Sequence, residues 1–145
     1  MKPHITLVNP AAPVGATMHW PFALLGLGYI AAVLEKAKYK VDVIDCQISN
    51  LSTEEFKEEI KKRQPNIVGV TSSTLTYKTG LKLIKAVKEL LPNCIIIAGG
   101  PHVTFWDGNA LEECPELDIV VRKEGENTIL ELVQKIEMGK SYDDV

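Results

Sequence analysis

The residues that could carry out acid–base, nucleophilic or metal chemistry are few and lie far apart in this sequence. They are three histidines and three cysteines: His4, His19, His102, Cys46, Cys94 and Cys114. The histidine spacing matches no metal-ligand pattern, and the cysteines form no Cys-x-x-Cys pair. Cys94 lies in an apolar run and is expected in the core, while a cysteine–histidine pair brought together by loops stays open. The sequence therefore predicts no complete active site and no metal site in this chain.

A run of hydroxyl side chains follows the third of five apolar segments. Five of the six residues 71–76 carry a hydroxyl group. One hydroxyl is enough to cap the helix expected to follow. The others could donate hydrogen bonds to a polar, uncharged ligand or accept them from it. Helix capping and ligand binding are therefore both open for this loop.

Two adjacent glycines, Gly99 and Gly100, follow the fourth apolar segment. Because they lack Cβ atoms, they allow the backbone to approach a flat ligand closely; a tight turn before Pro101 is the alternative. No Gly-x-Gly-x-x-Gly loop follows the first segment, so ordinary dinucleotide binding is not indicated. The glutamates of residues 122–128 are explained by the dipole of the helix that they begin.

Five short segments rich in valine and isoleucine must position these loops. They are residues 5–8, 41–44, 67–71, 94–98 and 119–121. Each is apolar and lies one βα unit from the next, which is typical of strands buried on both faces of a parallel sheet. We therefore predict a five-stranded parallel sheet in a flavodoxin-like (Rossmann-like) three-layer α/β/α sandwich, with strand order 2-1-3-4-5. In such folds ligands bind at the carboxyl ends of the strands.

Helical patterns fill the gaps between these strands. They cover residues 22–38, 52–63, 77–91 and 126–137, with a short turn near 109–114. The first is apolar almost all round, so it is expected to be buried on most sides or to face a partner. Ser52 and Glu55 predict a capping box at the start of the second. The long segment 9–21 is either a flexible crossover or a wall of a ligand or partner site.

Composition limits the class of protein. The chain has 145 residues, of which 46% are hydrophobic, and a net charge of −3. This predicts one domain over residues 1–139, with 140–145 as a tail or the start of a linker. Basic residues are not in excess, so the composition does not indicate nucleic-acid binding. The longest apolar run, residues 21–34, is too short to span a bilayer. An odd number of scattered cysteines predicts a reducing, cytoplasmic environment.

Together these segments resemble a known domain. They are Leu7–Pro10, Pro21, Gly26–Glu35, Val41–Asp45, Pro65–Ser72, Gly99–Thr104 and Asp118–Glu126. In order and spacing they are similar to the N-terminal cobalamin-binding domain of cobalamin-dependent radical SAM enzymes. That group includes the magnesium-protoporphyrin monomethyl ester cyclase type and many methyltransferases.

The resemblance implies a cofactor and a place for it. In cobalamin-binding folds the nucleotide tail enters between the sheet and its helices, lined by the loops after strands 3 and 4. The implied cofactor-binding residues are Asn9, Pro10, Ser72, Ser73, Thr74, Leu75, Gly99, Gly100, Pro101, His102, Glu124 and Gly125. The wider family carries Asp-x-His-x-x-Gly after strand 1, whose histidine binds cobalt. Residues 9–15 lack it here, so cobalamin is expected without that histidine ligand.

A second motif is absent, and its absence bears on the chemistry. The radical SAM cluster motif Cys-x-x-x-Cys-x-x-Cys does not occur in this chain, and a 4Fe–4S cluster needs such thiolates. The resemblance therefore implies that S-adenosylmethionine and the 4Fe–4S cluster belong to a downstream radical SAM domain in cis. The function expected is a module that presents cobalamin to that domain. The alternative is a cobalamin-free module for domain interaction or substrate access.

Overall fold

A single sheet of five parallel strands forms the centre of the protein. The computed structural model describes residues 1–15, 24–143 and 145. The strands are β1 (His4–Asn9), β2 (Lys40–Asp45), β3 (Ile67–Thr71), β4 (Ile95–Gly99) and β5 (Ile119–Val120). Their order is β2-β1-β3-β4-β5, and every neighbouring pair is parallel. The predicted fold and strand order are confirmed.

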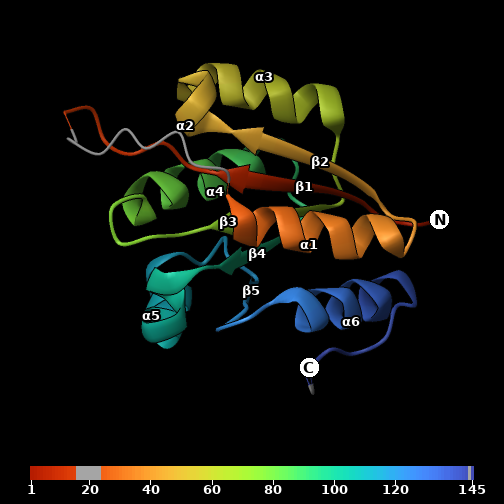
Figure 1. Cartoon of the computed structure of the whole chain (residues 1–145). Helices are drawn as coiled ribbons and strands as arrows, with labels where there is room; N and C mark the ends of the chain where they lie inside the picture. The colour runs from red at the N-terminus through yellow and green to blue at the C-terminus, as the bar shows by residue number, and fades with distance from the viewer. Residues whose placement is uncertain (16–23, 144) are drawn as a thin grey trace.

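Helices cover both faces of the sheet and complete the three layers (Figure 1). The helices are α1 (Leu25–Lys36), α2 (Cys46–Ser49), α3 (Thr53–Arg63), α4 (Tyr77–Leu90), α5 (Pro101–Glu113) and α6 (Glu126–Glu137). On one face, α3, α4 and α5 bury Phe56, Ile84 and Val103 in one apolar cluster. On the other face, α1 and α6 bury Leu34 and Leu132 in a second cluster. Since both sheet faces are covered, the strands can be apolar throughout.

The helix starts follow local chemistry, with one difference from prediction. The capping box of Ser52 and Glu55 is present at the start of α3. The helical turn predicted near residues 109–114 is present but belongs to a longer helix, because α5 runs over Pro101–Glu113 with a kink at Trp106. Only two residues of α5, Val103 and Ala110, are buried. A helix that buries so few side chains needs no apolar stripe, which is why the sequence does not reveal it.

The first helix is only partly covered. Leu27 and Leu34 of α1 are buried, whereas Leu25 and Tyr29 are 67% and 60% exposed. The start predicted for this helix, at residue 22, falls outside the described residues. Among the residues that the structure describes, no helix is long and apolar enough to cross a membrane.

Candidate functional site

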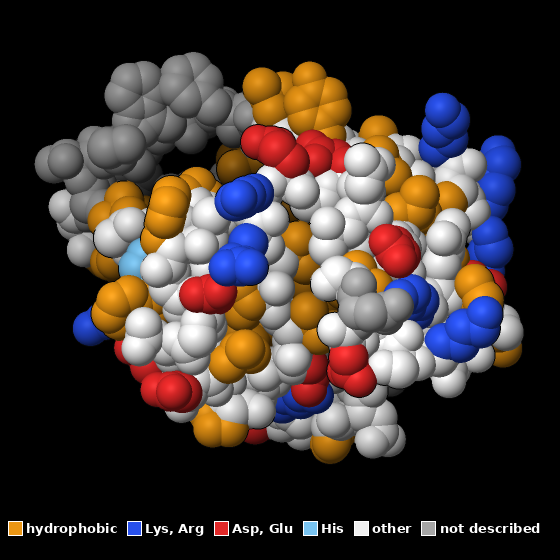
Figure 2. Space-filling view, turned by 90° about the horizontal axis from the view of Figure 1, so that it is seen from below, with side chains coloured by type: hydrophobic (Ala, Val, Ile, Leu, Met, Phe, Trp, Pro, Cys, Tyr) orange, Lys and Arg blue, Asp and Glu red, His pale blue; other side chains and the backbone are white. Residues whose placement is uncertain are grey.

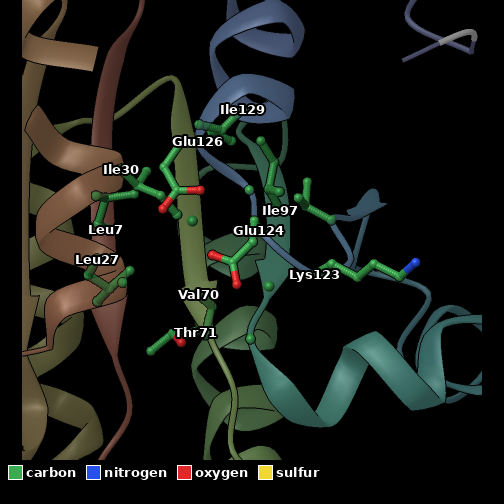
Figure 3. A pocket seen from close by; sticks show the side chains of 16 residues that line it. Leu7, Leu27, Ile30, Val70, Thr71, Ile97, Lys123, Glu124, Glu126 and Ile129 are labelled. Atoms are coloured by element: carbon green, nitrogen blue, oxygen red, sulfur yellow. The ribbon is translucent and has the colours of Figure 1, made fainter. Parts of the chain in front are cut away.

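A cavity of about 140 Å³ lies between the sheet and helices α1 and α6, near the carboxyl ends of the central strands. The sheet contributes residues of β1, β3 and β4, among them Leu7 and Thr71. The opposite wall comes from α1, through Leu27 and Ile30, and from α6, through Ile129. Figure 3 shows these side chains facing one another across the space. The walls are therefore mostly aliphatic and suit an apolar, flat group.

Glycines of the sheet and of helix α1 line the cavity. In the sheet, Gly69 pairs with Leu7 on one side and Ile97 on the other, so a gap separates two large side chains. A Cβ atom on Gly69 would lie 2.9 Å from Leu7 Cδ2, and one on Gly99 would lie 3.7 Å from the Val121 carbonyl oxygen. On α1, a Cβ atom on Gly26 would meet no atom within 4 Å. A side chain at Gly26 or Gly99 would therefore have room, whereas one at Gly69 would displace Leu7.

Gly100 also lines the cavity, but the fold itself requires it. Its φ is +100°, a region that other residues rarely adopt. A Cβ atom there would lie 2.7 Å from the Ser72 carbonyl oxygen. That same oxygen accepts a hydrogen bond of 3.1 Å from the His102 backbone N–H. A substitution at Gly100 would therefore disturb the β3–α4 and β4–α5 loops as well as the cavity.

Polar groups of the cavity come mainly from the loop that joins β5 to α6. Glu124 and Glu126 line the cavity, and Figure 3 shows both carboxylates directed into it. Lys123 also lines it, but its side chain extends away from the centre. The Lys123 backbone N–H donates a 3.0 Å hydrogen bond to Thr104 Oγ1, which ties this loop to α5. Thr71 adds one hydroxyl group from the end of β3.

The structure brings four of the twelve predicted site residues to this cavity: Gly99, Gly100, Glu124 and Gly125. The other eight do not line it: Asn9, Pro10, Ser72, Ser73, Thr74, Leu75, Pro101 and His102. Strand alternation explains Ser72, because successive side chains point to opposite faces and Thr71 takes the cavity side. Ser72 is buried beside Tyr77 on the other face of the sheet.

The remaining hydroxyls and His102 form a separate group at the start of α4 and α5. The His102 ring lies 4.1 Å from the ring of Tyr77, and its Nδ1 is 3.2 Å from Thr74 Oγ1. The Tyr77 hydroxyl donates to Glu113, and burial together with this bond raises the pKa of Tyr77. These contacts order the β3–α4 loop outside the cavity.

The structure also places Ser73 in the loop after β3 and Asn9 at the end of β1, two of the residues predicted to bind the cofactor. The Ser73 and Thr76 hydroxyls accept from each other's backbone N–H, at 3.3 and 3.1 Å, so these two side chains stabilise the turn into α4. Asn9 Nδ2 donates 2.9 Å to Asp45 Oδ1, which joins the carboxyl ends of β1 and β2. His19 falls outside the described residues.

Several cavity residues were not anticipated from the sequence: Gly26, Leu27, Ile30, Gly69 and Glu126. The signal for Gly69 was available, because a glycine inside a buried strand often marks the close approach of a ligand or backbone. Gly26 gave a weaker signal, as a glycine within a helical pattern.

The thiols show no sign of catalytic use. Cys46, Cys94 and Cys114 are unpaired and buried. Burial is the main cause that raises the pKa of Cys46 and of Cys94 to about 11, and it also raises the pKa of Cys114. Within residues 1–15, 24–143 and 145, no three histidine, cysteine, aspartate or glutamate side chains gather as a metal site.

Comparison with known proteins gives a consistent set of relatives. Residues 12–133 match the B12 binding domain family. An uncharacterized methyltransferase of Pyrococcus horikoshii is 37% identical over 116 residues, which cover 80% of this chain and 25% of that protein. The anaerobic magnesium-protoporphyrin IX monomethyl ester cyclase of Cereibacter sphaeroides is 34% identical over 119 residues, or 81% of this chain and 19% of the enzyme. The chain thus spans a quarter or less of these relatives.

Solved structures share the fold. The cobalamin-dependent S-adenosylmethionine radical enzyme OxsB, with aqua-cobalamin and S-adenosylmethionine bound, superposes with a TM-score of 0.84 at 24% identity. That match covers 99% of this chain and 20% of OxsB. The DrrB receiver domain also matches, with a TM-score of 0.65 at 16% identity, over 95% of this chain and 99% of that one. The architecture alone is therefore compatible with more than one function.

Proposed function

Because the chain belongs to the B12 binding domain family, we propose that its cavity receives the nucleotide tail of cobalamin and that its carboxyl edge presents the corrin ring to a catalytic domain. The observation that carries this proposal is the set of glycines in sheet, helix and loop. Gly26, Gly69, Gly99 and Gly125 all line the cavity, and at Gly26 and Gly99 the backbone faces space that a side chain could fill. The residues present therefore fit a flat group inserted between the sheet and its helices.

The chain's own part is to bind, orient and keep water away. Leu7, Leu27, Ile30, Ile97 and Ile129 provide aliphatic walls from both layers. Burial of an aromatic base against such walls is favourable because apolar surface leaves water. When bound, cobalamin supplies a cobalt centre able to carry a methyl group or an electron, while the protein determines its orientation.

We place the reaction that uses the cofactor in another part of the polypeptide. The chain spans a quarter or less of the methyltransferase and cyclase relatives. It contains no Cys-x-x-x-Cys-x-x-Cys motif. We therefore place S-adenosylmethionine and a 4Fe–4S cluster in a radical SAM domain in cis, with residues 140–145 leading toward it. A reducing, cytoplasmic location accords with three unpaired cysteines.

A second function is favoured by a different observation. Large apolar side chains are exposed on two helices beside the site: Leu25 and Tyr29 on α1, and Phe105 on α5, which is 88% exposed. Figure 2 shows hydrophobic side chains between charged ones on the face seen from below. A module that uses such residues to contact a partner domain, without binding cobalamin, is the alternative.

Titration of the purified chain with hydroxocobalamin, followed by absorbance and by retention on gel filtration, tests the proposal. We expect saturable, one-to-one binding and a changed corrinoid spectrum, because the cavity would bind the nucleotide tail and change the surroundings of the corrinoid. Absence of retained corrinoid at tens of micromolar would refute cobalamin binding by this chain and favour the interaction module.

A further inference from the structure

Two carboxylates that line the cavity, those of the exposed Glu124 and the half-buried Glu126, have no protein partner within the described part of the chain. Glu124 and Glu126 both line the cavity, and both point toward its interior in Figure 3. No hydrogen bond or ion pair among the described residues involves either side chain. The dipole of α6 accounts for a glutamate in its first turn, but it does not require the carboxylate to face the cavity.

The charge around these carboxylates is not balanced from the cavity walls. Lys123 is the one basic residue among the lining residues described, and its side chain extends away from the centre. The neighbouring Arg122 pairs instead with Asp107, at 3.1 Å. The other lining residues are aliphatic side chains, glycines and the hydroxyl of Thr71. The cavity therefore offers acceptors for hydrogen-bond donors and disfavours an anionic group.

We infer that Glu124 and Glu126 accept hydrogen bonds from ribose hydroxyls of the nucleotide tail and keep its phosphate outside the cavity. This inference rests on the proposed function. It goes further by assigning a part of the nucleotide tail to each wall of the cavity. The aliphatic side chains take the base, and the two carboxylates take the sugar. A carboxylate at the carboxyl edge of a parallel sheet is a known solution for reading ribose hydroxyls in nucleotide-binding folds.

The tail can be tested separately from the corrin ring, because cobinamide is the same corrinoid without the nucleotide. We would measure the dissociation constants of hydroxocobalamin and of cobinamide for the unaltered chain, for Glu124→Gln, for Glu126→Gln and for the double variant. The matched control is Glu131→Gln, since Glu131 lies on α6, pairs with Lys135 at 3.5 Å and does not line the cavity. Circular dichroism and thermal unfolding would verify that each variant is folded.

Each cavity substitution is expected to raise the dissociation constant of hydroxocobalamin about fivefold, the difference between a hydrogen bond to a charged acceptor and one to a neutral acceptor. The double variant should show a larger loss. Cobinamide binding should not change, and Glu131→Gln should leave both ligands unaffected.

The opposite result is equally definite. If the unaltered chain binds hydroxocobalamin and the double variant binds it equally well or more tightly, the carboxylates do not hold the sugar, and the inference is overturned while the proposed function stands. Tighter binding would indicate that they repel a nearby phosphate. If the unaltered chain does not bind hydroxocobalamin, the proposed function and this inference are both overturned.

Discussion

Replacing Gly26 by leucine should close the cavity while leaving the domain folded. Gly26 lies one helical turn before Ile30, so their side chains share the face of α1 that lines the cavity. A Cβ atom on Gly26 meets nothing within 4 Å, so leucine enters open space without a clash. Gly28 provides the matched control, because its Cβ position is equally open but it does not line the cavity.

The size of the effect follows from the area that the cavity buries. An aromatic group of about 150 Å² contributes about 4 kcal/mol when it is buried at about 25 cal/mol per Å². Excluding it from the cavity would therefore weaken hydroxocobalamin binding about a thousandfold. Folding should not suffer, because leucine is favoured over glycine in a helix by about 0.5–1 kcal/mol. The same gain is expected for Gly28→Leu, which should keep full affinity.

The assay is a spectrophotometric titration of the unaltered chain, Gly26→Leu and Gly28→Leu, with urea unfolding of all three. Loss of binding in Gly26→Leu alone, with unchanged or higher stability, is the expected pattern. Binding by Gly26→Leu within threefold of the unaltered chain would show that the tail does not occupy this cavity. Equal loss in both variants would refute the reasoning as well, since it would place the ligand over the exposed side of α1.

Two further predictions concern the scaffold. Lys38, which follows α1, has a φ of +66°. Lys38→Gly should therefore raise the free energy of unfolding by about 1 kcal/mol in urea titration, whereas Lys38→Ala, which keeps the strain, should not. Burial raises the pKa of Cys46 and Cys94 to about 11 and shields both thiols. In native protein at pH 8 we thus expect slow reaction with a disulfide reagent and fast reaction in denaturant; fast native labelling would contradict the buried placement.

The fold could be predicted because each strand is short, apolar and separated from the next by a helical repeat. The parallel arrangement follows from that pattern, and the order β2-β1-β3-β4-β5 is the simplest doubly wound order for five such units. The first part of α5, before the turn predicted near residues 109–114, was missed for a physical reason. Two buried residues, Val103 and Ala110, make no stripe, and Pro101 reads as a loop residue although it is suited to a first helical turn.

The cavity lies at the edge of the sheet where the sequence predicts a site, and four of the twelve named residues line it, while their role in binding stays a prediction. Gly99, Gly100 and Glu124 could be found because they follow strands and lie in loops. Whether Thr71 or Ser72 faces the cavity depends on strand alternation, and a shift of one residue reverses the answer. A cavity wall inside a helix, such as Gly26, depends on which side of α1 packs on the sheet. An apolar helix does not reveal that side in its sequence.

The cavity also separates the two functions considered for this chain. Glycines of the sheet, of α1 and of the β5–α6 loop come to the same place, although they lie far apart in the sequence. None of Gly26, Gly69 and Gly99 has a positive φ, so the backbone does not require glycine at these three positions, in contrast to Gly100. At Gly69 a Cβ atom would lie 2.9 Å from Leu7 Cδ2, so packing against Leu7 already favours glycine there. A module that only contacted a partner domain would gain packing from side chains at Gly26 and Gly99, where a Cβ atom meets nothing closer than 3.7 Å. Glycine at positions 26 and 99 is therefore expected where a ligand supplies the missing contacts, which favours cobalamin binding over the interaction module.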